Sequence, residues 1–215
     1  MTAGNNSLAT ADATTGTVLA DITGVVLAGG QSSRMGRDKA GISLEQGAGQ
    51  NFLSRTAALL AACCQQVLIA GRAHPDYAHC LDEVPGQGPM GGIATALASS
   101  GRACLVLSCD LPFMEPAILE RLIAHRARRF AGALATVYRQ KDTGQAESLV
   151  AIYEYAALPC FLASLRGMKL HVSRAIPLSR QHFLDYSPEE AQFFFNVNTP
   201  GDLLAARKLR ASGSP

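Results

Sequence analysis

The chain has 215 residues, a length that fits one compact domain with a single hydrophobic core and excludes an assembly of several large domains. Hydrophobic residues make up 48% of it and charged residues 17%, and it contains no stretch of about 18 mainly apolar residues. This composition is typical of a soluble globular protein and excludes a disordered or membrane-spanning chain. The formal net charge of +2 is too small for a protein that binds nucleic acid by neutralising phosphates.

Arginine dominates the basic residues, since 15 of the 19 are arginine. The planar guanidinium group matches phosphate and carboxylate geometry, so this excess is compatible with a small anionic ligand, and a bias in the coding sequence explains it equally well. The six cysteines show neither C-x-x-C spacing nor the density of a disulfide scaffold, which predicts reduced thiols. The first residues lack a basic segment followed by an apolar core, so we expect a cytoplasmic protein without a secretory signal or a membrane partner.

Apolar patterning predicts the order of the secondary-structure elements. Residues 1–20 are rich in Thr, Ala, Gly, Asn and Ser and lack apolar periodicity, which predicts a disordered leader. From Ile22 onward, the predicted strands are 22–28, 67–70, 104–107, 133–138 and 149–153. The predicted helices are 52–63, 91–98, 116–128, 156–165 and 200–209. This alternation predicts one α/β domain over residues 21–210, a three-layer sandwich with a mainly parallel sheet, and a frayed tail over residues 211–215.

Polar residues that follow the predicted strands are the first candidates for a site. In an open parallel sheet, ligands bind outside the carboxyl ends of the strands. Four polar clusters occupy such positions: after Leu27, near Leu81, after Leu107 and after Phe195, where residues 193–195 are expected to end a buried strand.

The first cluster reads LAGGQSSRMGRDK and contains adjacent glycines, Gly29 and Gly30. Glycines let the backbone approach a ligand closely, and their N–H groups can cradle phosphate oxygens while Arg34 and Lys39 add positive charge. The loop lacks the Lys-Ser/Thr ending of a Walker A motif and does not fit G-x-G-x-x-G. We interpret it as a phosphate-binding loop, and the alternative is a glycine-rich turn with surface charges.

This segment, LAGGQSSRMGRDKA, resembles the signature of the molybdenum cofactor guanylyltransferases. Three more segments are similar to that family's motifs and come in the same order: DEVPGQGPMGG from Asp82, SCDLP from Ser108 and NVNTPGDL from Asn196. The resemblance implies a Rossmann-like nucleotidyltransferase that transfers GMP from GTP to molybdopterin, releases pyrophosphate and uses Mg²⁺. Its expected partners are GTP, molybdopterin and a molybdoenzyme, or the chaperone of one, that receives the product.

The resemblance also implies roles for the residues that match these motifs. Nucleotide contacts are expected from Leu27, Ala28, Gly29, Gly30, Lys39, Asp82, Gly88, Pro89, Gly92 and Asp110. The expected catalytic residues are Arg34, Lys39 and Asp110. Lys39 would neutralise the α-phosphate, and Arg34 with the glycine N–H groups would neutralise the leaving pyrophosphate.

The chemistry and positions of two aspartates, Asp110 and Asp82, support these roles independently of the resemblance. Asp110 directly follows the apolar run 104–107, where a carboxylate at the rim of the sheet can hold Mg²⁺ that bridges phosphates; it could instead cap the helix that starts near Pro116. The carboxylate of Asp82 can accept hydrogen bonds from the N1–H and the exocyclic amine of guanine, and the alternative is an ordinary turn residue.

Two asparagines near the C-terminus are expected to complete the metal site. Alternate residues of an extended segment point to one face, so Asn196 and Asn198 could both reach the side where Asp110 lies. An amide oxygen is a suitable neutral ligand for Mg²⁺, and the resemblance assigns a metal or nucleotide role to this motif. The alternative is that Asn198 only caps the helix introduced by Thr199 and Pro200.

The second-substrate region departs from the family pattern. Residues 145–149, QAESL, stand where relatives often carry a proline, in a region that usually faces the pterin. Lys169 is the best available basic residue for the molybdopterin phosphate, and an exposed basic helix face explains it equally well. Relatives also often place an asparagine where this chain has Ala70-Gly71-Arg72.

Three other functions compete with this one. A molybdopterin cytidylyltransferase would share the fold, but LAGG and GPMGG look more like the guanylyl branch. A sugar or isoprenoid nucleotidyltransferase usually carries a different glycine loop. A non-catalytic adaptor that delivers the cofactor would not need Lys39 and Asp110.

Overall fold

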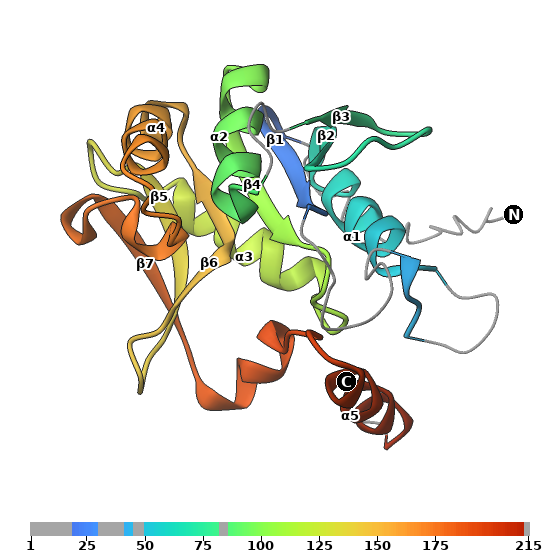
Figure 1. Cartoon of the computed structure of the whole chain (residues 1–215). Helices are drawn as coiled ribbons and strands as arrows, with labels where there is room; N and C mark the ends of the chain where they lie inside the picture. The colour runs from blue at the N-terminus through green and yellow to red at the C-terminus, as the bar shows by residue number, and fades with distance from the viewer. Residues whose placement is uncertain (1–18, 30–40, 45–49, 82–85, 213–215) are drawn as a thin grey trace, which may run out of the picture.

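The computed structural model describes residues 19–29, 41–44, 50–81 and 86–212 (Figure 1). These residues form a seven-stranded sheet in the order β3-β2-β1-β4-β6-β5-β7. The strands are β1 (Leu19–Leu27), β2 (Cys64–Ala70), β3 (Ala78–Cys80), β4 (Ala103–Ser108), β5 (Ala135–Gln140), β6 (Ala146–Tyr153) and β7 (Gln181–Tyr186). The α-helices are α1 (Phe52–Ala61), α2 (Gly88–Ser100), α3 (Pro116–Arg126), α4 (Leu158–Arg166) and α5 (Pro200–Ala211).

The sheet is mainly parallel, as predicted. Each neighbouring pair is parallel except β4–β6 and β5–β6, because β6 runs against its two neighbours. After β1 the chain adds β2 and β3 on one side and then returns to place β4 on the other side of β1. The strand order therefore reverses between β1 and β4, and the loops after these strands diverge there to leave room for a ligand.

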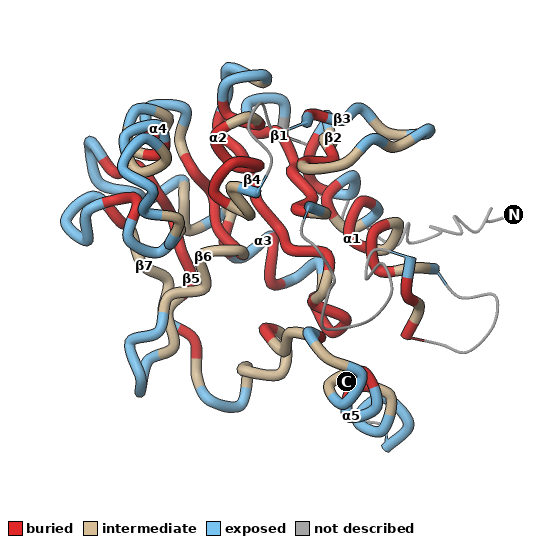
Figure 2. Tube along the Cα trace, in the orientation of Figure 1, coloured by how far each residue is buried: buried red, intermediate tan, exposed pale blue. Residues whose placement is uncertain are grey.

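Helices cover both faces of the sheet, which gives the three predicted layers. Buried side chains of α1 and α3, including Leu60 and Leu122, pack on one face together with Leu105 of β4. Side chains of α2 and α4, including Ile93 and Phe161, pack on the other face. Figure 2 shows the central strands buried between these layers. All six residues of β4 are buried, which explains its continuous apolar run.

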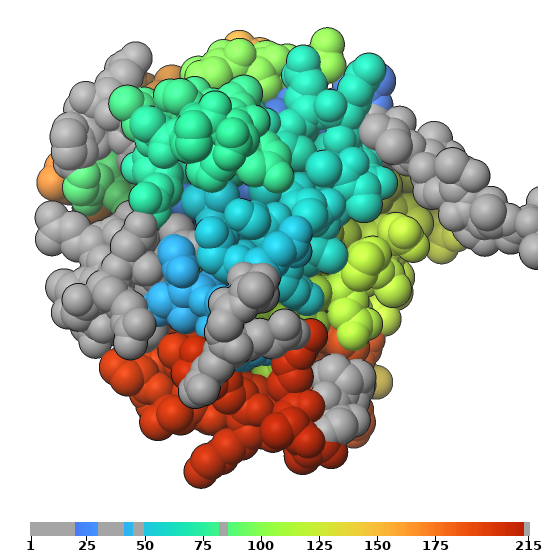
Figure 3. All heavy atoms as spheres, turned by 90° about the vertical axis from the view of Figure 1, so that its right-hand side faces the viewer, coloured from blue at the N-terminus to red at the C-terminus, as the bar shows by residue number. Residues whose placement is uncertain are grey.

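Helix α5 packs away from the sheet in a small third cluster. Its Leu203 is buried with Phe113, Val197 and two residues of an earlier loop, Ile42 and Leu44. The Arg207 guanidinium group fixes this contact, since it donates to the carbonyl oxygens of Leu44 at 3.0 Å and Ser43 at 3.1 Å. In Figure 3 the C-terminal region, in red, lies below α1, in cyan, and below residues 41–44, in light blue. This packing holds the segment before α5 close to the end of β4.

Apart from shifts of a few residues in the bounds of other elements, the observed and predicted elements differ in three respects. Strand β1 begins at Leu19, before the predicted start at Ile22, and residues 1–18 and 213–215 lie outside the described part of the chain. Strands β3 and β7 were not predicted, because one has only three residues and the other, QHFLDY, mixes polar and apolar residues. The expected strand end at 193–195 is wrong: Pro188–Phe194 is a 3₁₀-helix, begun by a capping box between Ser187 and Glu190.

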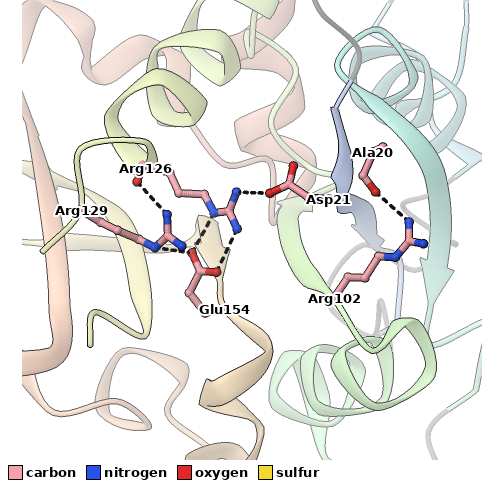
Figure 4. Close-up of polar contacts among 6 residues, drawn as sticks. All are labelled: Ala20, Asp21, Arg102, Arg126, Arg129 and Glu154. Atoms are coloured by element: carbon pink, nitrogen blue, oxygen red, sulfur yellow. Dashed lines mark hydrogen bonds and ion pairs between the residues drawn. The ribbon is translucent and has the colours of Figure 1, made fainter. Parts of the chain in front are cut away.

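A group of charged residues forms ion pairs at the end of the sheet opposite the rim where β4 ends (Figure 4). The Arg126 guanidinium at the end of α3 donates to both carboxylate oxygens of Glu154, at 2.7 and 2.9 Å, and to Asp21 of β1 at 2.8 Å. The hydrogen bond with Arg126 lowers the pKa of Asp21, and the bonds with Glu154 raise the pKa of Arg126. These contacts join β1, α3 and the end of β6, away from the rim where the candidate site lies.

Candidate active site

The ends of three neighbouring strands meet at one rim of the sheet. The N–H of Ala28, just after β1, donates to the carbonyl oxygen of Ala70 at the end of β2, 3.1 Å away. On the other side, the N–H of Cys109 donates to the carbonyl oxygen of Leu27, 3.4 Å away. The predicted nucleotide residues Leu27 and Ala28 therefore lie beside the end of β4, at the position where the strand order reverses.

The loops after β1 and β2 touch each other through glycines. Gly71 has φ +89°, and a Cβ placed on it would lie 2.6 Å from the Cα of Gly29, too close for any side chain. This contact explains why the chain carries glycine after β2. Of the remaining loop residues predicted to bind phosphate, Gly30, Arg34 and Lys39 lie outside the described residues, as does Asp82.

The predicted nucleotide residues Gly88, Pro89 and Gly92 lie in the first turns of α2. Gly88 has φ +59° and Pro89 follows at the start of the helix, a position that suits proline because early N–H groups have no partner within the helix. The other N–H groups of this turn, and the positive end of the helix dipole, favour an anion. Gly92 is buried one turn further along.

Asp110 lies two residues beyond β4, and hydrogen bonds connect it to Ser108 and to Val197. The Ser108 hydroxyl donates to Asp110 Oδ1 at 2.6 Å, and the N–H of Val197 donates to the Asp110 carbonyl oxygen at 2.9 Å. Ser108 was not predicted as a site residue. The alternative in which Asp110 caps the next helix is wrong, because α3 has Glu115 at its N-cap. The second bond brings the Asn196 segment to Asp110, as the sequence predicts.

The two asparagines differ in their surroundings. Among the described residues, Asn196 Oδ1 is buried and finds no hydrogen-bond donor. Asn198 is exposed, and its N–H donates to Asp202 Oδ2 at 2.9 Å. The alternative in which Asn198 caps α5 is wrong, since Thr199 is the N-cap and forms a capping box with Asp202.

A cavity of about 670 Å³ opens beside these groups. Ser108 and Asn196 line it at the end of β4, and Gln140 and residues 145–150 line it from the β5–β6 hairpin. Residues 170–173 complete it, so the predicted pterin-facing segment lies on its wall. Lys169 is exposed and immediately precedes this lining segment, and no lysine or arginine lines the cavity in the described part of the chain.

Inside this cavity a carboxylate and a phenol form a hydrogen-bonded pair. The Tyr186 hydroxyl donates to Glu147 Oε1 at 2.6 Å, and the Tyr186 ring lies against Phe194 with centroids 4.2 Å apart. Burial raises the pKa of Glu147, although the bond from Tyr186 opposes the shift. Burial and the neighbouring carboxylate also raise the pKa of Tyr186. Sequence patterns did not reveal this pair, because its members are 39 residues apart and β7 was not predicted.

The described part of the chain does not contain a metal site built from His, Cys, Asp and Glu side chains alone. In residues 19–29, 41–44, 50–81 and 86–212, no cluster of three or more His, Cys, Asp and Glu side chains could hold a metal ion. A magnesium site here would therefore combine Asp110 with amide and substrate oxygens. Within the same residues, none of the helices has the length and apolarity that crossing a bilayer requires.

The sheet order and the polar rim define an α/β protein of the class that binds its ligands at a strand-order reversal. The family described as the MobA-like NTP transferase domain matches residues 24–180. The molybdenum cofactor guanylyltransferase of Xanthomonas euvesicatoria is 36% identical over 185 residues, covering 83% of this chain and 90% of that protein. The chain therefore belongs to the MobA-like NTP transferase family, together with proteins named molybdenum cofactor guanylyltransferase.

Two further comparisons agree with this assignment. The molybdenum cofactor biosynthesis bifunctional protein of Synechocystis is 34% identical over 187 residues, which cover 83% of this chain and 52% of that longer protein. The crystal structure of molybdopterin-guanine dinucleotide biosynthesis protein A from Archaeoglobus fulgidus aligns with a TM-score of 0.71. It is 23% identical and the match covers 88% of this chain and 99% of that one, so it supports the predicted fold.

Proposed function

We propose that this protein transfers GMP from GTP to molybdopterin, forms molybdopterin guanine dinucleotide and releases pyrophosphate, with Mg²⁺ as its cofactor. One observation carries the proposal beyond family membership. Asp110 and the Asn196 segment, 86 positions apart in the numbering, are joined by the bond from Val197 N–H at the rim where β1 and β4 end. A nucleotide transferase needs its metal-binding and nucleotide-binding groups together at such a rim.

The donors at this rim suit Mg²⁺. Asp110 supplies a hard carboxylate whose Oδ1 is oriented by Ser108, and Asn196 supplies a buried amide oxygen that has no donor among the described residues. Asp110, with Asn196 and Asn198, would hold the ion, and substrate phosphates would supply further oxygens. Bound Mg²⁺ would neutralise charge on the phosphates of GTP.

The reaction needs positioning more than proton transfer. A terminal phosphate oxygen of molybdopterin attacks the α-phosphorus of GTP, the bond to the bridging oxygen breaks, and pyrophosphate leaves. The attacking phosphate is already ionised, so no general base is required. Lys39 would neutralise the α-phosphate, Arg34 and the N–H groups of Gly29 and Gly30 would stabilise the leaving pyrophosphate, and Asp82 would accept guanine's donors.

The cavity beside Asn196 is the proposed place for molybdopterin. It opens next to Asp110, it has room for a pterin at about 670 Å³, and the Ser108 and Asn196 end lies nearest the nucleotide loops. Lys169, just outside the lining segment, would attract the phosphate as the substrate enters. The product would pass to a molybdoenzyme or to its chaperone, and we expect the reaction to take place in the cytoplasm.

An activity assay tests this proposal: the protein is incubated with molybdopterin, Mg²⁺ and each of the four NTPs in turn. The dinucleotide product is identified by mass spectrometry, and the released pyrophosphate is measured. We expect a guanine dinucleotide and stoichiometric pyrophosphate. Asp110→Asn should abolish most of this rate, whereas Glu120→Gln, a charge removal on the exposed side of α3, should leave it unchanged. A cytosine product would assign the cytidylyl activity, and nucleotide binding without pyrophosphate release would indicate a delivery adaptor.

A further inference from the structure

A carboxylate, that of Glu147, lies on the cavity wall. Among its described lining residues, Glu147 is the one acidic side chain, and the other ionisable ones are His171 and Tyr186. A half-buried carboxylate without a lysine or arginine beside it is costly to desolvate unless hydrogen-bond donors reach it. The Tyr186 hydroxyl supplies one donor, at Oε1. No bond is found for Oε2 among the described residues, so the carboxylate can accept from a ligand in the cavity.

Tyr186 fixes the direction of this carboxylate. Its ring is held between aromatic neighbours, with Phe194 at 4.2 Å and Tyr138 at 6.2 Å between centroids. The Tyr138 hydroxyl in turn donates to the carbonyl oxygen of Ile118 at 2.8 Å, which ties this aromatic group to α3. The ring that carries this hydroxyl is therefore held in the packed core, and the hydroxyl orients the carboxylate before a ligand arrives.

We propose that Glu147 recognises the 2-amino-4-oxopyrimidine edge of the pterin and that Tyr186 is its positioning residue. This edge offers an N3–H and a 2-amino N–H that are parallel, and one carboxylate can accept both. The inference rests on the proposed function, which makes a pterin the second substrate. Guanine carries the same pair of donors, so the test separates the pterin of molybdopterin from the base of GTP.

The same arrangement sets the direction in which molybdopterin enters. A phosphate beside Glu147 would be repelled, and the lining offers it no lysine or arginine there. Ser108 and Asn196, which also line the cavity, lie with Asp110 at the end of β4. With the pterin edge at Glu147, the phosphate of the substrate would point to the Ser108 and Asn196 end of the cavity, which lies nearest the proposed GTP site.

Binding of free pterin and of lumazine tests the recognition without any catalytic step. Lumazine replaces the 2-amino group by a carbonyl oxygen, which would face the carboxylate and be repelled. Equilibrium dialysis should show that the unaltered protein prefers pterin by about ten-fold or more. Glu147→Gln offers both a donor and an acceptor and should remove most of this preference, and Tyr186→Phe should weaken it while keeping the ring stack. Glu120→Gln, outside the cavity, is the matched control.

Steady-state kinetics then separates the two ligands that share this edge. We expect Glu147→Gln to raise KM for molybdopterin about ten-fold and to leave KM for GTP unchanged. A raised KM for GTP alone, or an unchanged preference for pterin over lumazine in Glu147→Gln, would overturn the inference while leaving GMP transfer intact. Loss of the pterin preference in Glu147→Gln supports the inference, whether or not the unaltered protein forms a dinucleotide. Failure of the unaltered protein to form any dinucleotide would instead overturn the proposed function.

Discussion

The Cα of Gly29 is the nearest atom to the position that a Cβ would occupy on Gly71, at a separation of 2.6 Å. The reverse contact is also tight, because a Cβ on Gly29 would lie 3.0 Å from the Cα of Gly71. The loops that follow β1 and β2 therefore lie backbone against backbone at the rim of the sheet. A side chain at either position would push the proposed phosphate-binding loop away from β2.

Gly71→Ala should impair both folding and nucleotide binding. The left-handed φ of +89° penalises alanine by about 1–2 kcal/mol, and displacement of the Gly29 loop adds to this loss. Gly101→Ala is the matched control, since Gly101 also has a left-handed φ of +62° but a Cβ added to it would meet no described atom within 4 Å. We expect KM for GTP to rise at least several-fold in Gly71→Ala alone. Equal KM values in the two variants would contradict this account.

Local patterns predicted much of the sheet and the place of Asp110 in the candidate site. The position of Asp110 could be predicted because it comes two residues after a fully buried apolar strand. Ser108 could not, since a serine at a strand end has no distinctive pattern and its role depends on the carboxylate it contacts. Glu147 depends on Tyr186 of β7, a strand whose mixed sequence does not alternate cleanly. Contacts between distant residues decide such roles, and local sequence does not encode them.

Two substitutions in the segment before α5 distinguish helix capping by Thr199 from metal binding by Asn198. Thr199→Ala removes the hydroxyl that accepts from Asp202 N–H, so it should lower the free energy of unfolding by about 1 kcal/mol without changing the Mg²⁺ requirement. Asn198→Ser leaves the backbone bond to Asp202 in place and should be much less destabilising. It should raise the Mg²⁺ concentration for half-maximal rate if Asn198 binds the ion as proposed. Normal turnover at low Mg²⁺ would exclude Asn198 as a ligand.

Two bidentate ion pairs of different burial predict different losses of stability. The Arg126–Glu154 pair has side chains that are 11% and 14% exposed, whereas those of Arg139–Asp185 are 38% and 45% exposed. Glu154→Gln removes the negative charge that faces the mostly buried Arg126 guanidinium. It should therefore lower the free energy of unfolding by about 2–3 kcal/mol. Asp185→Asn should lower it by less than about 1 kcal/mol. Urea denaturation measures both, and similar losses would show that burial does not set the contribution.

A stacked histidine pair predicts that stability falls in mild acid. The rings of His125 and His182 lie 4.1 Å apart with an angle of 10° between them, and Phe130 packs edge-on against His182. His182 Nε2 is buried without a hydrogen-bond partner among the described residues, while His125 contacts the Phe183 carbonyl oxygen at 2.9 Å. Burial lowers the pKa of His182, and the nearby His125 and Arg129 lower it further by opposing a second positive charge.

Because the pKa of His182 is lower in the folded state, the unfolded chain binds its proton at a higher pH. The stabilising contribution of neutral His182 is therefore complete above pH of about 6.5 and is lost as the pH falls toward the lowered value. We expect the free energy of unfolding to be smaller at pH 5.5 than at pH 7.5, and His182→Phe, which keeps a ring in the stack, to reduce this difference. His79→Gln, at an exposed position on β3, is the control. An identical difference in the unaltered protein and His182→Phe would show that another group causes the acid sensitivity.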